Sequence, residues 1–298
     1  MKSRRVLVAA PLLIAALALS GCGTGAPGKN SAGQLTVVAS FYPLQFAAAQ
    51  IGGDHVAVTS LTKPGAEPHD IELTTHDVAM VSTAGLVIYE KGLQGAVDKA
   101  AESQAADRSL NVAPAANLTL RLPSGATDPH FWLDPQRYSN VANEIAARLS
   151  SADPANKADY EKNAKVFVDK LATISEEFTR GLANCQRRDL VTSHAAFGYL
   201  AQRFGMRQVA INGISPDQEP NATELAAVSN YARAHGVTTV YAETLASPAI
   251  AATVARESGA RVATLDPIEG LTKQSAGKDY FEVMRSNLTA LRAGQGCS

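Results

Sequence analysis

The 298-residue sequence has little of what several protein classes require. Its formal net charge is only −1, which argues against a protein that binds nucleic acid through charge. It has no phosphate-binding Gly-x-x-x-x-Gly-Lys-Ser/Thr loop, no Gly-x-Ser-x-Gly nucleophile motif and no His-Glu-x-x-His metalloprotease motif. These absences favour a binding protein over an enzyme.

Long apolar runs are also scarce, and the one at residues 6–19 is shorter than the roughly 20 residues that span a bilayer. It follows Lys2, Arg4 and Arg5 and ends before Leu-Ser-Gly-Cys at 19–22. This pattern predicts a lipoprotein signal peptide at 1–21, with Cys22 carrying the lipid. An ordinary signal peptide with a chance cysteine and a membrane helix are the alternatives. Residues 22–34 are small and polar, which predicts a flexible tether.

Only three cysteines are present, and Cys185 and Cys297 remain once Cys22 is set aside. An even pair in an oxidising compartment indicates a disulfide, with two unpaired thiols as the alternative. Because there is no Cys-x-x-Cys, a structural zinc knuckle is not expected.

Short β-branched runs alternate with helical patterns along the rest of the chain. The expected strands are 35–39, 56–61, 86–89, 110–112, 189–193, 207–211, 237–241 and 261–265. The expected helices are 75–84, 134–149, 155–183, 195–204, 222–235, 248–258 and 280–292. Such alternation is typical of parallel sheets covered by helices.

The helix at 155–183 has one apolar stripe and a length of roughly 40 Å, more than one small domain needs. We interpret it as a rigid connector. The predicted fold is therefore α/β, with two Rossmann-like lobes of parallel sheet joined by one long connector helix. The expected boundaries are an N-terminal lobe at 35–153, the connector at 154–184 and a C-terminal lobe at 185–298.

Four side chains that can bind metal stand at loop positions near strand ends. His69 follows a strand, His130 precedes a helix, and His194 and Asp266 end strands. Parallel α/β sheets bind ligands beyond the carboxyl ends of their strands, and imidazoles with one carboxylate suit Zn²⁺. A shared zinc site is one interpretation, and four unrelated loop residues are the other.

Two glutamates could support such a site. Glu67 is close to His69 in the chain, and Glu243 follows the strand at 237–241. Either could orient a ligand, with exposure to solvent as the alternative. The other three histidines, His55, His76 and His235, fit a turn, a first helical turn and a helix end, and we assign them no metal.

Six short motifs resemble those of one known family. They are Ser-Phe-Tyr-Pro at 40–43, Ile-Gly-Gly-Asp at 51–54, Pro-Gly-Ala-Glu-Pro-His-Asp at 64–70, Pro-His-Phe-Trp-Leu-Asp-Pro at 129–135, Thr-Ser-His-Ala-Ala-Phe-Gly-Tyr-Leu at 192–200 and Leu-Asp-Pro at 265–267. With them the chain resembles the zinc and manganese receptors of bacterial ABC importers, the cluster A-I solute-binding proteins. The match extends from about residue 37 to residue 291.

The resemblance implies a metal held between the lobes by His69, His130, His194 and Asp266. A histidine at position 194 goes with zinc in this family, whereas a glutamate goes with manganese, so Mn²⁺ is the less favoured cargo. Many zinc receptors carry a histidine-rich loop in the first lobe. Residues 91–127 contain no histidine here, so a capture role for that loop is not expected.

The function that the resemblance implies is capture of Zn²⁺ outside the cell membrane and delivery to an ABC importer permease with its ATPase. We expect a monomer that is held at the membrane by its lipid alone, with only modest lobe motion. The rival interpretations are an extracytoplasmic zinc hydrolase, a surface adhesin and a receptor for manganese or iron.

Overall fold

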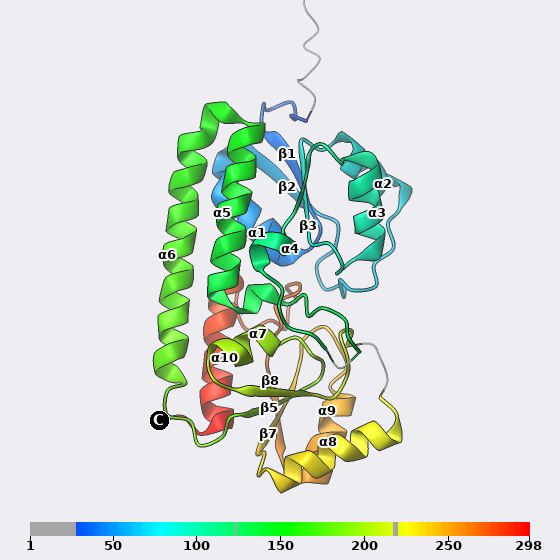
Figure 1. Ribbon diagram of the computed structural model, residues 1–298, viewed down its shortest axis with the longest axis vertical. Coiled ribbons are helices and arrows are strands. Elements are labelled where there is room, and N and C mark those ends of the chain that lie inside the picture. The colour runs from blue at the N-terminus through cyan, green and yellow to red at the C-terminus, as the bar shows by residue number, and fades with distance from the viewer. Residues whose placement is uncertain (1–27, 123, 217–219) are drawn as a thin grey trace, which may run out of the picture.

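The computed structural model describes residues 28–122, 124–216 and 220–298 (Figure 1). The predicted signal peptide and Cys22 lie outside these residues. Within the described part, no helix combines the length and the apolar character needed to cross a bilayer.

The first lobe is built on a four-stranded parallel sheet in the order β2-β1-β3-β4. Its strands are β1 (Leu35–Ala39), β2 (Val56–Ser60), β3 (Leu86–Tyr89) and β4 (Ser109–Asn111). Its helices are α1 (Tyr42–Gly52), α2 (Thr75–Thr83), α3 (Gly95–Gln104), α4 (Ala113–Ala116) and α5 (Pro135–Ala152). Because all four strands are parallel, their carboxyl ends meet at one edge, which faces the second lobe.

The second lobe repeats this plan with a parallel sheet in the order β6-β5-β7-β8. Its strands are β5 (Asp189–Thr192), β6 (Arg207–Ala210), β7 (Thr239–Ala242) and β8 (Arg261–Thr264). Its helices are α7 (Gly198–Arg203), α8 (Ala222–Ala234), α9 (Ala249–Ser258) and α10 (Tyr280–Gln295).

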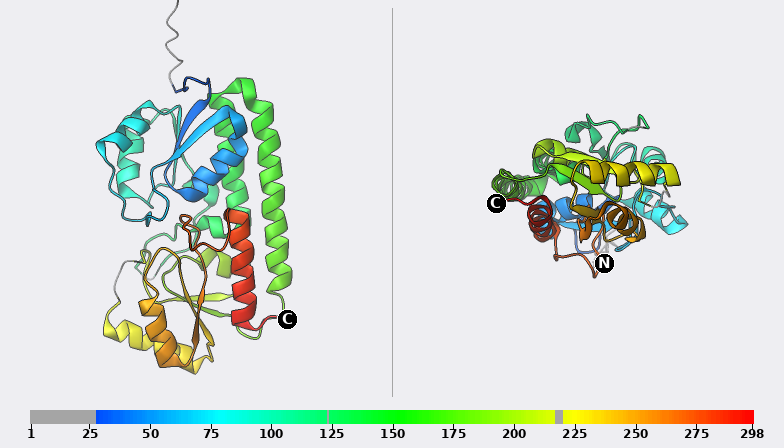
Figure 2. Two further views of the ribbon diagram at one scale, coloured as in Figure 1. Left: turned by 180° about the vertical axis from the view of Figure 1, so that it is seen from behind. Right: turned by 90° about the horizontal axis from the view of Figure 1, so that it is seen from below.

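One helix of 25 residues, α6 (Lys157–Gly181), runs along both lobes (Figures 1 and 2). It packs on α1 and α5 of the first lobe and on α10 of the second. After its end, Cys185 forms a disulfide with Cys297, which follows α10. The predicted α/β fold with a long connecting helix, and the predicted disulfide, are confirmed.

The lobes are also joined by a common core, in which buried side chains from one face of each sheet and from α5, α6 and α10 form one cluster. At the junction, the Trp132 indole donates to the Pro267 carbonyl at 2.7 Å, and the Tyr280 hydroxyl donates to the Trp132 carbonyl at 2.6 Å. Arg203 of α7 makes two hydrogen bonds, at 2.8 and 2.9 Å, to Asp134 at the start of α5. This continuity favours lobes that move little relative to each other.

The described part of the expected tether contacts the first lobe. The Gly28 carbonyl accepts a 2.8 Å hydrogen bond from the Thr36 N–H, and the Lys29 ammonium lies 3.0 Å from Asp153. Residues 28–34 are therefore held against β1 by backbone hydrogen bonds that their composition does not reveal.

Candidate metal site

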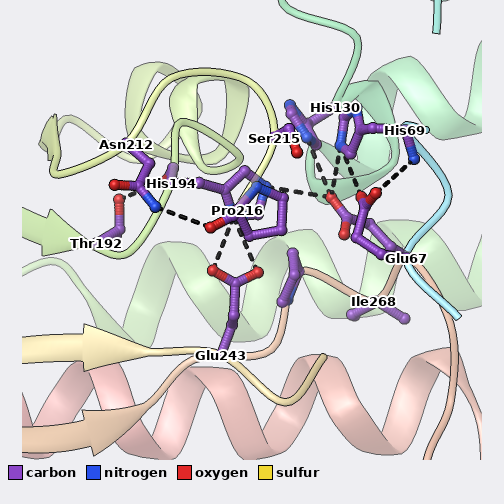
Figure 3. Close-up of polar contacts among 12 residues, drawn as sticks. Glu67, His69, His130, Thr192, His194, Asn212, Ser215, Pro216, Glu243 and Ile268 are labelled. Atoms are coloured by element: carbon purple, nitrogen blue, oxygen red, sulfur yellow. Dashed lines mark hydrogen bonds and ion pairs between the residues drawn. The ribbon is translucent and has the colours of Figure 1, made fainter. Parts of the chain in front are cut away.

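The three histidines singled out by sequence meet between the lobes (Figure 3). His69 lies in the loop between β2 and α2, and His130 directly precedes a short 3₁₀ turn, Phe131–Leu133, that leads into α5. His194 follows the end of β5 by two residues. The carboxyl edges of two parallel sheets thus supply the site, as expected for this class of fold.

The three imidazoles converge on one carboxylate oxygen, Oε1 of Glu269. The Nε2 atoms of His69, His130 and His194 lie 3.3, 3.2 and 3.2 Å from it. One donor atom from each of the four residues lies within 4.8 Å of every other. All four side chains are buried, with Glu269 and His130 fully excluded from solvent.

Two of the imidazoles are oriented through their other nitrogen. The Nδ1 atom of His130 lies 2.8 Å from Asp128 Oδ1, which also accepts the His130 backbone N–H at 3.0 Å. The Nδ1 atom of His194 lies 2.9 Å from Glu243 Oε1. A carboxylate on Nδ1 fixes the ring and keeps the proton there, so the Nε2 lone pair is free for a metal.

Glu67 supports His69 in a different way. Its Oε2 atom accepts the His69 backbone N–H at 3.0 Å, and its Oε1 atom lies 3.7 Å from His69 Nε2. Glu67 thus positions the backbone of the loop that presents His69, while its negative charge lies beside the imidazole.

Burial and neighbouring charges have opposite effects on the pKa values of the side chains in this site. Burial disfavours ionised Glu269, but His194 and the other two imidazoles hold the pKa of its carboxyl well below the usual value. Burial lowers the pKa of His69. For His194, burial favours the neutral ring, yet Glu269 and Glu243 raise its pKa to about 10. The Glu269 carboxylate thus stabilises positive charge among the imidazoles.

The donor set fits Zn²⁺, which takes three imidazoles and a carboxylate in tetrahedral sites. One buried atom supports this fit, because Oε2 of Glu269 has no hydrogen-bond partner in the described structure. A buried polar atom without a partner is costly unless something else satisfies it. A bound cation would do so here.

Asp266, predicted as the fourth ligand, is not among the four converging residues. Its Oδ2 atom accepts hydrogen bonds from the Thr244 hydroxyl at 3.1 Å and the Ser275 hydroxyl at 3.0 Å. Its Oδ1 atom accepts the Ile268 backbone N–H at 2.8 Å. Asp266 thus fixes the loop that presents Glu269, and we replace it with Glu269 in the proposed ligand set.

Sequence reasoning missed Glu269 and Asp128. The expectation that ligands follow strand ends selected Asp266, the acid nearest to the end of β8. The loop continues for three more residues before Glu269 reaches the site. The signal for Asp128 was available, since a carboxylate two residues before a candidate ligand can accept from both its backbone and its ring. The histidines assigned no role stay apart from the site, with His55 near Asp159 and His235 stacked on Tyr231.

Two parallel α/β lobes around a buried group of three imidazoles and one carboxylate define a two-lobed α/β protein with a candidate metal site between its lobes. The chain belongs to the family described as zinc-uptake complex component A, periplasmic, whose model matches residues 37–294. The resemblance seen in the sequence is thereby confirmed.

Similar proteins come from several bacteria. The high-affinity zinc uptake system protein ZnuA of Bacillus subtilis is 35% identical over 96% of this chain and 95% of its own length. The zinc-binding protein AdcA of Streptococcus pyogenes is 35% identical, but this chain spans only 56% of its length. The Zn(II)-bound ZnuA-like domain of Streptococcus pneumoniae AdcA superposes with a TM-score of 0.76 at 35% identity, covering 88% of this chain and 99% of that domain.

Proposed function

We propose that this protein captures Zn²⁺ outside the cytoplasmic membrane and delivers it to the permease of an ABC importer. The observation that carries the proposal is the convergence of three imidazole Nε2 atoms on one buried carboxylate. His69, His130, His194 and Glu269 are the proposed ligands. Family membership and the zinc-binding relatives support the same cargo.

A carrier fits this site better than an enzyme. Catalytic zinc sites use three protein ligands and leave one position for water or substrate. Here four protein donor atoms lie within 4.8 Å of one another, and none of the four residues is more than 8% exposed. Such a closed shell suits capture and release of the ion itself.

The ligand types favour zinc over manganese. Imidazole suits Zn²⁺, whereas Mn²⁺ prefers carboxylate, carbonyl and water oxygens. Three of the four proposed donors are imidazole nitrogens. Two of them are further held by Asp128 and Glu243, which raises the basicity of the rings.

A bound ion would also connect the two lobes, because each lobe supplies two of the proposed ligands. His69 and His130 belong to the first lobe, and His194 and Glu269 to the second. A bound ion would therefore tie the lobes together and stabilise the folded protein, because it binds the native state only. Release to a permease would require at least some of these four proposed ligands to move away from the ion.

The remaining parts of the proposal concern location. We propose that Cys22 carries a lipid that keeps the receptor near one permease and its ATPase, and that the receptor acts as a monomer. A tethered receptor meets its membrane partner at a raised effective concentration.

The test is metal analysis followed by competition. Protein purified without added metal is expected to contain zinc, and Zn²⁺ is expected to displace Mn²⁺ in a titration. His194→Ala should lower zinc affinity far more than His76→Ala, its exposed control. Tighter binding of Mn²⁺, or equal affinities of the two variants, would refute the proposal.

A further inference from the structure

The two lobes place equivalent residues at equivalent points of their sheets. The Ser40 N–H after β1 donates to the Ile88 carbonyl of β3 at 2.9 Å, and the Ser193 N–H after β5 donates to the Tyr241 carbonyl of β7 at 3.0 Å. Two residues beyond each acceptor stands a glutamate, Glu90 in the first lobe and Glu243 in the second. These glutamates are therefore counterparts.

Both glutamates stand where the strand order of their sheet reverses, between β1 and β3 and between β5 and β7. Such switch points are the usual ligand sites of open α/β sheets. The second lobe uses its switch point, since Glu243 holds His194 there. The residue equivalent to His194 in the first lobe is Phe41, which follows Ser40 and has no group for Glu90 to hold.

Glu90 is left without a partner as a result. Its side chain is buried, the residue being 2% exposed, and neither carboxylate oxygen has a hydrogen-bond partner in the described structure. The hydroxyl of Ser40 and the side-chain oxygen of Gln94 are also buried and without partners. Four unsatisfied oxygens therefore belong to three residues at one end of the first sheet.

Gln94 is near Glu90 in the chain and is linked to Ser40 by hydrogen bonds through Thr62. The Leu93 N–H donates to the Glu90 carbonyl at 3.3 Å, so Gln94 directly follows the turn that begins at Glu90. The Gln94 amide donates to the Thr62 hydroxyl at 3.0 Å, which in turn donates to the Ser40 carbonyl at 2.8 Å.

The surroundings of Glu90 are electronegative. Burial, together with the charges of Asp128 and Asp98, raises the pKa of Glu90 well above its usual value. A buried carboxylate without a partner is strongly unfavourable, so either a proton or a cation must neutralise it. A cavity of about 610 Å³ reaches Glu90, and Asn117 and Thr127 add polar groups to its wall. Lys91 also lines this cavity, but its ammonium is paired with Glu102.

We propose that Glu90, with Ser40 and Gln94, forms a second cation site at the switch point of the first lobe. All its protein donors are oxygens, so it should take a hard cation, Mg²⁺ or Ca²⁺, that keeps part of its water shell. Zinc is not its ligand, because the site offers no imidazole. The proposal does not rest on the function proposed above.

The experiment measures thermal unfolding of zinc-loaded protein at about pH 8, a value at which protons compete weakly with metal. Millimolar MgCl₂ or CaCl₂ is compared with choline chloride of equal ionic strength. One of the divalent cations should raise the midpoint of the wild-type protein, since it binds the native state. Glu90→Gln should abolish the rise, whereas Glu72→Gln, which alters an exposed carboxylate, should retain it.

Calorimetric titration of Mg²⁺ and Ca²⁺ into wild-type zinc-loaded protein gives a second readout that needs no variant, and Ser40→Ala should weaken the binding it detects. Zinc content of Glu90→Gln should equal that of the wild type, which separates this site from the one between the lobes. No binding heat in the wild-type protein, or an equal rise in Glu90→Gln and wild type, would overturn the proposal and leave Glu90 neutralised by a proton.

Discussion

Replacing Glu269 with glutamine tests the proposed zinc site at its centre. The substitution keeps the shape of the side chain and removes its charge. Three imidazole Nε2 atoms lie within 3.3 Å of Oε1 of this carboxylate. Because Glu269 is fully buried, solvent water cannot compensate for the loss of its negative charge.

The size of the effect follows from this burial. Removing one partner of a buried ion pair costs about 3–5 kcal/mol, because the other charge is left uncompensated. Every 1.4 kcal/mol is a factor of about ten in a dissociation constant. Zinc affinity of Glu269→Gln should therefore fall by roughly two to three and a half orders of magnitude, measured by competition with a zinc-binding indicator dye.

Asp266→Asn is the matched control, since Asp266 is a buried carboxylate three residues away on the same loop. Its oxygens accept hydrogen bonds from Thr244, Ser275 and the Ile268 backbone, so its loss should mainly lower stability. Removing a group that hydrogen-bonds a ligand directly costs about 10- to 100-fold in metal affinity, and Asp266 contacts no proposed ligand side chain, so we expect its zinc affinity to change by less than about tenfold. A larger loss in Asp266→Asn than in Glu269→Gln would refute the assignment of the fourth ligand.

Four further predictions follow from the same structure. The pKa of His194 is raised to about 10 in the folded protein, so its contribution to the stability of metal-free protein should be complete below the unfolded pKa of about 6.5 and should be lost as pH rises toward 10. Zinc affinity should rise over the same pH range, because the imidazole must lose its proton to bind the ion. Denaturant titrations in which the stability of metal-free protein rises with pH would contradict this. Glu243→Gln should weaken zinc binding about 10- to 100-fold in a calorimetric titration, because Nδ1 of His194 loses its carboxylate, and an unchanged affinity would remove Glu243 from the site. Replacing Cys185 and Cys297 with serine removes a disulfide between residues 112 positions apart in the chain. The free energy of unfolding in denaturant titrations should fall by about 2–5 kcal/mol, while zinc affinity stays unchanged. Equal stability of variant and wild type would contradict this prediction. Scattering profiles with and without zinc should nearly coincide, because one core spans both lobes, and marked compaction on zinc binding would argue against the rigid connection.

The regular elements were predictable where their sequence pattern was strong. The strands are β-branched runs, and α6 follows one apolar stripe whose members, from Tyr160 to Phe178, are buried. Helix α2 begins with a capping box in which Thr74 and Asp77 bond to each other, a spacing that is typical of helix starts. Local chemistry and tertiary structure agree in these elements.

Helices α1 and α3 were not predicted, for different reasons. Helix α1 has no side-chain cap and no acidic residue in its first turn, and its apolar residues do not form a narrow stripe. It is packed between β1 and α6, so burial rather than local signals stabilises it. Helix α3 begins after Gln94, whose amide is engaged with Thr62 and Pro68 instead of capping the helix. Tertiary contacts determine both helices, and a single sequence does not display those contacts.

The proposed fourth ligand could not be predicted from the sequence for a related reason. Ile268 has a φ of +58°, which is rare for a β-branched residue and costs about 1–3 kcal/mol. Asp266 accepts the Ile268 N–H, and Trp132 of the first lobe donates to Pro267, so contacts from both lobes impose this conformation. The turn at Ile268 leads directly to Glu269, whose carboxylate meets the imidazoles. The position of a ligand in the second lobe thus depends on a hydrogen bond from the first, and a packed junction between the lobes is a condition of the site itself.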